Sequence, residues 1–238
     1  MVSEAVSVKS GQDAISGRNL KLTVRGLLTQ ADFNDALDRL LDLPLKKIVN
    51  PLFGLLLDRE ELIRWRAVSA MGRTVSAMAD TKMESARVIM RRLMWHLNEE
   101  SGGIGWGVPE TFGEIMAVHE ELAREYACIL MSYICVHQNF LEHEVLQRGV
   151  LWGIGRLAGV RPERLAGVDA DIMPFLDSAD TVHRGYAAWA LGNLGSPEAA
   201  GPLARLTADP EELTFYKNLR LTRTTVGNLA RTAILQLY

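Results

Sequence analysis

The sequence is poor in cysteine, with only Cys128 and Cys135 among its 238 residues. They stand seven positions apart in a segment that we predict to be one helix. This separates them by roughly 10 Å along the axis, too far for a disulfide within the helix. Both lie among apolar residues, so we expect inert thiols in the core. They form no CxxC pair and give no zinc signature, and reduced thiols favour a cytoplasmic location.

Long hydrophobic runs and an excess of positive charge are also missing. No apolar run reaches the roughly 18–20 residues that span a bilayer, so no membrane segment is expected. The first twenty residues lack the apolar stretch of a secretory signal. The sequence has 26 Lys and Arg against 29 Asp and Glu, a formal net charge of −3. This balance argues against nucleic acid as a partner, because a general nucleic-acid binder needs many cations toward the phosphates.

Familiar catalytic signatures are absent as well. The sequence holds no HExxH, no Gly-x-Ser-x-Gly and no GxxxxGK[ST] pattern, which removes the usual signals for a zinc protease, a serine hydrolase and a phosphate-binding loop. We therefore predict no catalytic residue, no metal ligand and no cofactor. The sequence leaves enzyme activity undecided and favours a non-enzyme.

Strand signals are scarce, whereas helical spacing is frequent. No long stretch alternates apolar and polar residues, and no Asn-Gly or Asp-Gly turn joins two such stretches. Apolar residues recur every three or four positions instead, as in 86–97. The sequence therefore predicts an all-α protein whose last helix extends from about 212 to 237. Residues 1–26 are richer in Ser and Gly, which predicts a partly ordered arm before a helical domain at 27–238.

The chain also repeats itself. Three segments can be aligned on a shared glycine and on similar flanking residues: 64–75 on Gly72, 147–158 on Gly155 and 183–195 on Gly192. Small residues at these positions would let one helix approach its neighbour closely. The alignment predicts stacked copies of one two-helix unit.

Within this pattern, residues 177–203 resemble the HEAT-like repeat of the phycobilisome-lyase type. Its consensus is Arg-x-x-Ala-Ala-x-Ala-Leu-Gly-x-Leu-Gly-x-x-x-Ala-x-x-x-Leu. Every specified position is met, by Arg184, Ala187, Ala188, Ala190, Leu191, Gly192, Leu194, Gly195, Ala199 and Leu203. The resemblance implies an α-solenoid of about five antiparallel helix pairs. It implies little about function, because such arrays include adaptors, lyases and DNA-repair enzymes. Residues 81–145 depart from the pattern, so no repeat boundaries are predicted there.

The Asp and Arg residues near the turns have two interpretations. In similar repeats an Asp in the turn and an Arg at the start of the second helix form a ladder between units. Asp58 with Arg64 or Arg66, and Asp177 with Arg184, fit that structural role. The alternative is a row of cations on the inner face that binds an anionic ligand. That row would consist of Arg64, Arg184, Arg148, Lys217, Arg220 and Arg223, the last three sharing one helix face.

Residues 98–114 form the most unusual stretch, with four glycines within six residues. We predict an inter-helix loop in which Trp106 either docks into the solenoid or serves as an aromatic anchor for a partner. Between 96 and 125 there are seven acids and one base, a local charge of −6. That excess would suit a basic peptide, although a solvated face is the commoner explanation of a charge run. The candidate binding residues here are Trp106, Asn98, Glu99, Glu100, Glu110 and Glu114.

The functional prediction is a non-catalytic scaffold or adaptor that binds a protein or peptide with its concave face and the 98–114 loop. One alternative is an enzyme component similar to the phycobilisome lyases, which would hold a tetrapyrrole or another carboxylated ligand. Its binding residues would be Arg148, Arg184, Lys217 and Arg220. Neither the partner's identity nor the oligomeric state follows from the sequence.

Two further resemblances are weaker. HEAT-like DNA glycosylases line their concave face with aromatics, and Trp65, Trp152 and Trp189 could do so here, although the repeat alignment predicts that they are core residues. The pairs His119-Glu120 and His143-Glu144 are similar to the di-iron ligands of deoxyhypusine hydroxylase. They do not recur at equivalent repeat positions, so no metal site is predicted.

Overall fold

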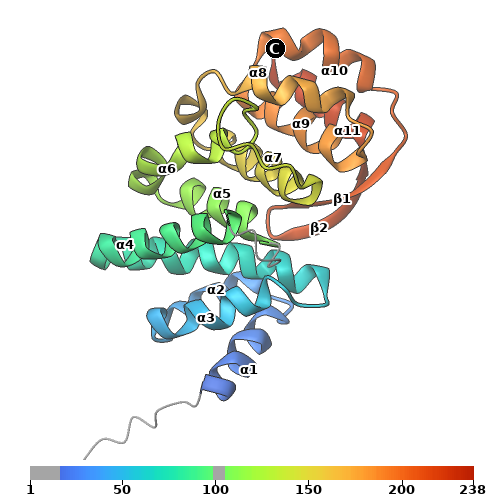
Figure 1. Ribbon diagram of the computed structural model, residues 1–238. Coiled ribbons are helices and arrows are strands. Elements are labelled where there is room, and N and C mark those ends of the chain that lie inside the picture. The colour runs from blue at the N-terminus through green and yellow to red at the C-terminus, as the bar shows by residue number, and fades with distance from the viewer. Residues whose placement is uncertain (1–16, 99–104) are drawn as a thin grey trace, which may run out of the picture.

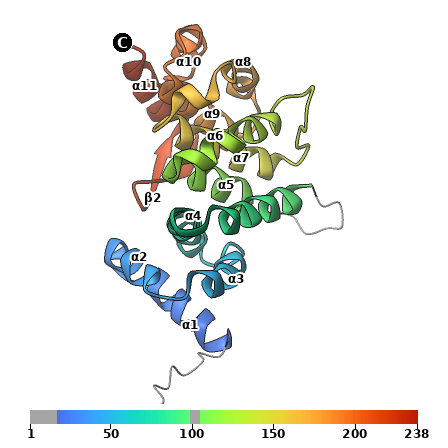
Figure 2. The same cartoon turned by 90° about the vertical axis from the view of Figure 1, so that its left-hand side faces the viewer.

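The computed structural model describes residues 17–98 and 105–238, most of which lie in helices stacked in chain order into one extended array (Figures 1 and 2). The inner layer consists of α2 (Phe33–Leu41), the first half of α4 (Glu61–Leu97), α5 (Val108–Val118), α7 (Glu144–Ala158), α9 (Thr181–Leu194) and α11 (Val226–Gln236). The outer layer consists of α1 (Gly17–Leu28), α3 (Leu45–Leu55), the second half of α4, α6 (Glu120–Ser132), α8 (Asp169–Ile172) and α10 (Ala200–Leu206). Short 3₁₀ turns, Pro162–Leu165, Met173–Asp177 and Pro197–Ala199, flank α8 and precede α10.

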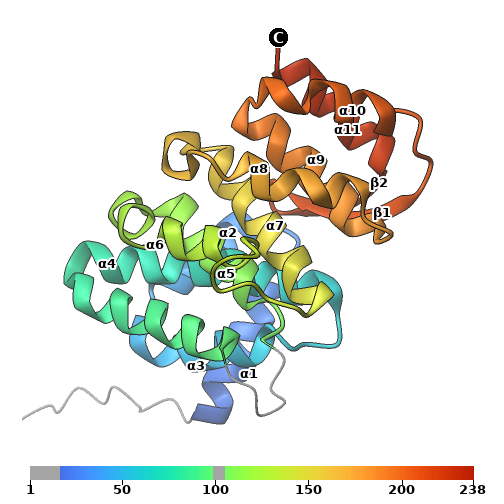
Figure 3. The ribbon, with the colours of Figure 1, turned by 45° about the horizontal axis from the view of Figure 1, so that its top comes forward.

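The long helix α4 belongs to two repeats, because it is broken at Lys82, whose φ and ψ of −155° and 87° are not helical. Its two halves lie side by side (Figure 3). The second half packs beside α3, where Arg92 donates to Asn50 at 2.6 Å and the rings of Phe53 and His96 lie 5.6 Å apart. The break therefore ends one helix pair and starts the next.

The predicted all-α solenoid is confirmed. In the part of the chain that the structure describes, five helix pairs follow one another: α3 with the first half of α4, its second half with α5, α6 with α7, α8 with α9, and α10 with α11. Helices α1 and α2 pack against α3 and α4 at the N-terminal end. Residues 17–26 of the predicted arm lie in α1, where Leu20 and Val24 are buried, whereas residues 1–16 lie outside the described residues.

Glycines hold the inner helices close together, as the repeat alignment predicts. A Cβ on Gly72 would lie 2.7 Å from the Glu114 side chain of α5. A Cβ on Gly155 would lie 2.6 Å from the Trp189 ring of α9, and one on Gly192 would lie 2.6 Å from Ala233 of α11. All three aligned glycines therefore occupy equivalent places, each against the next inner helix.

The predicted helix at 212–237 is wrong in its first half. Residues Glu212–Lys217 (β1) and Arg220–Thr225 (β2) form an antiparallel hairpin, and only then does α11 begin. The turn is Asn218–Leu219, both with positive φ, 51° and 62°. Asn tolerates this left-handed backbone, whereas in Leu it is strained. The β-branched and aromatic residues of the two strands favour extended backbone once another surface packs against them.

Two smaller expectations also fail. Cys128 is exposed and Cys135 is half-buried and lies beyond the end of α6, so the prediction of two core thiols on one helix is wrong, although both are free. The loop predicted at 98–114 is shorter, because residues from Val108 onward already belong to α5. None of the described helices is long and apolar enough to cross a membrane.

Candidate binding site on the inner face

The hairpin lies across the inner face of the solenoid, on a floor of three tryptophans. The ring of Tyr216 stacks on Trp65 at 5.1 Å, and the ring of Phe215 meets Trp189 edge-on at 4.9 Å. Trp152 lies between them, 4.8 Å from Trp65 and 6.2 Å from Trp189. The chain's own strand thus packs on all three tryptophans. Trp152 and Trp189 are buried, as expected of core residues, whereas Trp65 is half-buried.

Side chains of the inner helices bind the main chain of β1. The Trp152 indole N–H donates to the carbonyl of Tyr216 at 3.0 Å, and the Tyr186 hydroxyl donates to the carbonyl of Thr214 at 3.2 Å. Thr214 and Tyr216 pair with Arg223 and Leu221 in the register, at alternate positions of β1. In an antiparallel ladder, alternate residues direct their carbonyls away from the partner strand, so these two carbonyls can accept from the solenoid. The Ser69 and Tyr216 hydroxyls, 3.0 Å apart, attach the end of the strand to α4. The inner face therefore holds an extended segment by main-chain recognition.

On one side of β1, a pocket of about 270 Å³ opens where α4, α5, α7 and α9 begin. We call it the N-edge pocket. It is lined by Leu56, Glu61, Arg64, Trp65, Val68, Trp106, Gly107, Glu110, Val145, Arg148, Val182, Tyr186 and Thr214. Three of the predicted binding residues, Trp106, Glu110 and Arg148, thus come together here. Trp106 is 42% exposed at its mouth, with the ring of His143 at 6.2 Å.

Glu110 is the unusual group in the N-edge pocket. Its Oε2 is buried and has no hydrogen-bond partner among the described residues. Burial raises the pKa of this carboxyl to about 7, against the opposing effect of the Arg64 charge. The carboxyl fits because Gly149 has no side chain: a Cβ there would lie 2.6 Å from Oε2. A donor from outside the chain would meet an unsatisfied acceptor at this position.

The predicted Asp–Arg ladder exists, but with other partners. Arg25 pairs with Asp58 at 2.9 Å and Arg184 pairs with Asp209 at 2.9 Å, each joining successive units. Arg148 pairs with Asp180, the residue that caps α9. The pairing of Asp58 with Arg64 is wrong as a carboxylate pair, because Arg64 donates to the Asp58 main-chain carbonyl at 3.0 Å. The pairing of Asp177 with Arg184 is also wrong, because Asp177 contacts Arg205 at 3.7 Å.

Arg66 has a similar structural role, since it donates to the carbonyls of Leu28 and Gln30. Arg148 and Arg184, proposed in the lyase-type alternative to hold a carboxylated ligand, already have carboxylate partners in the chain. Two of the four cations that the alternative needs are therefore engaged within the chain.

The acidic segment is largely neutralised by neighbouring repeats. Glu114 is buried and accepts from Arg156 at 2.7 Å; burial raises its pKa and the Arg156 charge opposes that rise. Glu125 pairs with Arg87 at 2.6 Å, and Glu120 with Arg164 at 3.4 Å. The excess of acids along the sequence is therefore not an acidic patch on these helices. Asn98 is exposed at the end of α4, and Glu99 and Glu100 lie outside the described residues.

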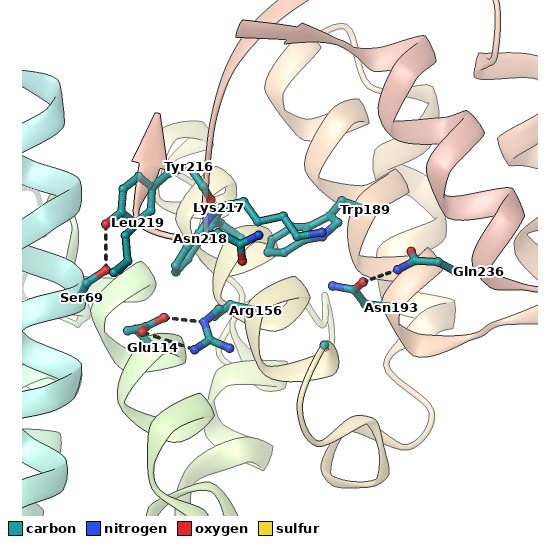
Figure 4. A pocket seen from close by; sticks show the side chains of 12 residues that line it. Ser69, Glu114, Arg156, Trp189, Asn193, Tyr216, Lys217, Asn218, Leu219 and Gln236 are labelled. Carbon is teal, nitrogen blue, oxygen red and sulfur yellow. Dashed lines mark hydrogen bonds and ion pairs between the residues drawn. The ribbon is translucent and has the colours of Figure 1, made fainter. Parts of the chain in front are cut away.

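On the other side of β1 lies a second pocket of about 400 Å³, the C-edge pocket (Figure 4). It is lined by Ser69, Glu114, Trp152, Arg156, Gly159, Trp189, Asn193, Tyr216, Lys217, Asn218, Leu219 and Gln236. The hairpin turn covers it, and the C-terminal parts of α7, α9 and α11 form its walls.

The three cations predicted to share a helix face are on the hairpin instead. Lys217 and Arg220 are cross-strand partners beside the turn, and Arg223 pairs with Thr214 in the register. Of the three, only Lys217 lines a described pocket. Arg223 is 3.8 Å from Glu212, with both side chains mostly exposed.

No motif in the sequence indicates that Tyr186, Thr214 and Tyr216 belong to the site. These residues can be identified as site residues only once the hairpin is known, and the sequence predicts a helix in its place. The one sequence feature that relates to the site is the recurrence of Trp152 and Trp189 at the same repeat position. Its simplest interpretation is packing in the core.

Comparison with known proteins agrees with this architecture. Residues 144–194, which comprise α7 to α9, match the family model described as a HEAT-like repeat. The chain therefore contains a HEAT-like repeat over these residues. An uncharacterized protein of Archaeoglobus fulgidus is 29% identical over 175 residues, 71% of this chain and 86% of that protein.

Among solved structures, similar ones are designed armadillo repeat proteins. YIII(Dq)4CqI has a TM-score of 0.50 at 19% identity and covers 92% of this chain and 100% of its own. YIII(Dq.V1)4CPAF in complex with peptide (KR)4 has a TM-score of 0.52 at 20% identity, over 92% of this chain and 99% of its own. At such identity the likeness concerns the fold alone.

Proposed function

We propose that this HEAT-like repeat protein is a non-catalytic scaffold that binds an extended segment of a partner protein on its inner face. The observation that carries the proposal is the position of β1. Indole and phenol donors from α7 and α9 already bind carbonyls of an extended strand on this face. Main-chain recognition of this kind is sequence-tolerant, which is how extended peptides are commonly bound.

The N-edge pocket is the proposed place of binding, because the hairpin covers the centre of the inner face. Trp106 supplies an exposed aromatic anchor, and Leu57, 62% exposed, continues the apolar surface beyond it. Aromatic residues at the centre of an interface commonly contribute most of the binding energy. A segment here would run beside Thr214 of β1 and over the starts of the inner helices.

A basic side chain fits this pocket better than an acidic one. Glu61 and Glu110 line it, and the buried Glu110 oxygen lacks a donor. Of the two cations in the lining, Arg148 is already paired with Asp180. An ammonium or guanidinium group would supply the missing donor and compensate the buried charge.

Titration with a fluorescent (KR)4 peptide tests the proposal. We expect saturable binding that Trp106→Ala weakens by about tenfold or more while the melting curve is retained. The matched control is Trp95→Ala, because Trp95 is even more exposed but lines no described pocket. It should bind like the wild type.

Equal affinity of Trp106→Ala and the wild type would contradict the proposed place of binding. Unfolding of Trp106→Ala would show that Trp106 is a packing residue instead. If neither (KR)4 nor a (ES)4 peptide binds the wild type, the scaffold proposal itself fails for short extended segments.

A further inference from the structure

The C-edge pocket is separated from the proposed peptide site by β1, and its lining has a different chemical character. With about 400 Å³ it falls within the usual range for small-molecule sites. Three different parts of the fold contribute to it: α5 and α7 the base, α9 and α11 one wall, and the hairpin turn the cover (Figure 4). A ligand in this pocket would therefore bind independently of a peptide in the N-edge pocket.

The charges around this pocket do not balance. Glu114 and Arg156 form an ion pair in its base, with Nε and Oε2 2.7 Å apart. Lys217, on the hairpin, has no ion-pair partner among the described residues. One carboxylate and two cations leave the lining with a formal charge of +1. A ligand with a single negative charge would neutralise it.

The hydrogen-bonding groups of the pocket also favour an anionic ligand, because a donor there lacks an acceptor. The Trp189 side chain is 4% exposed, and its indole N–H has no acceptor among the residues described. Two of the nearby side-chain amides bond to each other: Asn193 accepts from Gln236 at 3.2 Å and donates to the Gly155 carbonyl at 2.8 Å. The pocket thus has a surplus of donors, and what is missing is an acceptor.

The geometry points to a binding site for a small, flat ligand that bears one carboxylate. The carboxylate would lie between Lys217 and Arg156 and within reach of the Trp189 N–H, and the flat body would pack on the Trp189 ring. In Figure 4 these three side chains border the same space. Lys217 is exposed, and its long side chain lines the pocket, so a change of its conformation would admit the ligand.

The test uses benzoate as the probe, followed through the indole N–H signals in ¹H–¹⁵N spectra of the intact protein. We expect a saturable shift of the Trp189 N–H, since it gains an acceptor. The Trp152 N–H, already bonded to the Tyr216 carbonyl, serves as an internal control that should hardly move. Trp189→Phe assigns the signal. Benzamide, of similar shape but neutral, should bind at least tenfold more weakly than benzoate.

Lys217 and Arg220 provide a matched pair of variants, because they are cross-strand partners and only Lys217 lines the pocket. Lys217→Met should weaken benzoate binding about tenfold, whereas Arg220→Met should change it less than twofold. No saturable shift with benzoate, or equal loss in the two variants, would overturn the inference. Tighter binding of phenyl phosphate than of benzoate would overturn the assignment of a singly charged ligand.

Discussion

Among the glycines of the described residues, the one with the least room for a side chain is Gly113 of α5, which faces Gly153 of α7. A Cβ on Gly113 would lie 2.3 Å from the Gly153 Cα, a distance that no side chain can occupy without moving the two helices apart. Gly is a poor helix former: in a helix interior it is about 1 kcal/mol less favourable than Ala. Its presence at this contact therefore reflects the spacing of inner helices, which in turn sets the width of the inner face.

Replacement of Gly113 by Ala should lower the free energy of unfolding by about 1–3 kcal/mol, because overpacking outweighs the gain in helix propensity. The control is Gly26→Ala in α1, where a Cβ would meet no atom within 4 Å. That variant should be more stable by about 0.5–1 kcal/mol. Urea unfolding of both measures the difference, and a Gly113→Ala protein as stable as the wild type would show that the helices can separate at no cost.

Glu110 should make stability depend on pH. Its pKa is about 7 in the folded protein against an ordinary 4.5, so the folded state binds the proton more tightly than the unfolded chain. The contribution of this group to stability is full below about pH 4.5 and is lost as the pH rises through about 7, a fall of about 1–3 kcal/mol.

Glu110→Gln is neutral at every pH and should remove that fall. Urea unfolding at about pH 5 and about pH 8 compares the two proteins, in which all other titrating groups are shared. An equal pH dependence in both would mean that Glu110 is solvated and ionised in the folded protein, and it would weaken the case for a basic side chain in the N-edge pocket.

Among the elements, the hairpin is the one whose secondary structure could not be predicted from the sequence. The repeat pattern predicted the solenoid from locally readable signals, namely helical spacing and the recurring glycines at 72, 155 and 192. The strands of 212–225 were missed because their partners are distant: Tyr216 meets Ser69, 147 positions away, and Trp152, 64 positions away. Extended structure in this segment depends on that surface more than on its own sequence.

The same limit applies to the acidic segment. Its main partners, Arg87 for Glu125 and Arg156 for Glu114, stand 38 and 42 positions away, about one repeat. A local charge count cannot include a partner on the next helix pair. Of the candidate site, Trp106, Glu110 and Arg148 were predicted and do line one pocket, but what surrounds each of them could not be predicted.

Tyr186→Phe tests the attachment of the hairpin, because it removes only the hydroxyl that donates to the Thr214 carbonyl. The free energy of unfolding should fall by about 0.5–1.5 kcal/mol, and amide exchange in 212–217 should accelerate. Tyr238→Phe, at a position 96% exposed, should change neither quantity. Unchanged exchange in β1 of Tyr186→Phe would mean that the strand is held by its aromatic contacts alone.

At the scale of the whole molecule, the hairpin divides one inner face into two pockets. Its ends are adjacent, since the Val226 N–H donates to the Glu211 carbonyl at 3.0 Å, so a short Gly linker can replace 212–225. We expect such a variant to keep its helices by circular dichroism, because the helix pairs stack on one another without it. It should bind a fluorescent apolar dye through the exposed Trp65, Trp152 and Trp189. Loss of the helical signal would show that the solenoid needs the hairpin to fold.

The most direct test of the account is a map of hydrogen exchange with and without bound (KR)4 peptide. Binding along the N-edge pocket predicts slower exchange in 105–112, 145–150 and 182–187, with the outer helices α6 and α10 unchanged. Protection confined to the outer helices, or saturable binding that leaves these three segments unprotected, would contradict it.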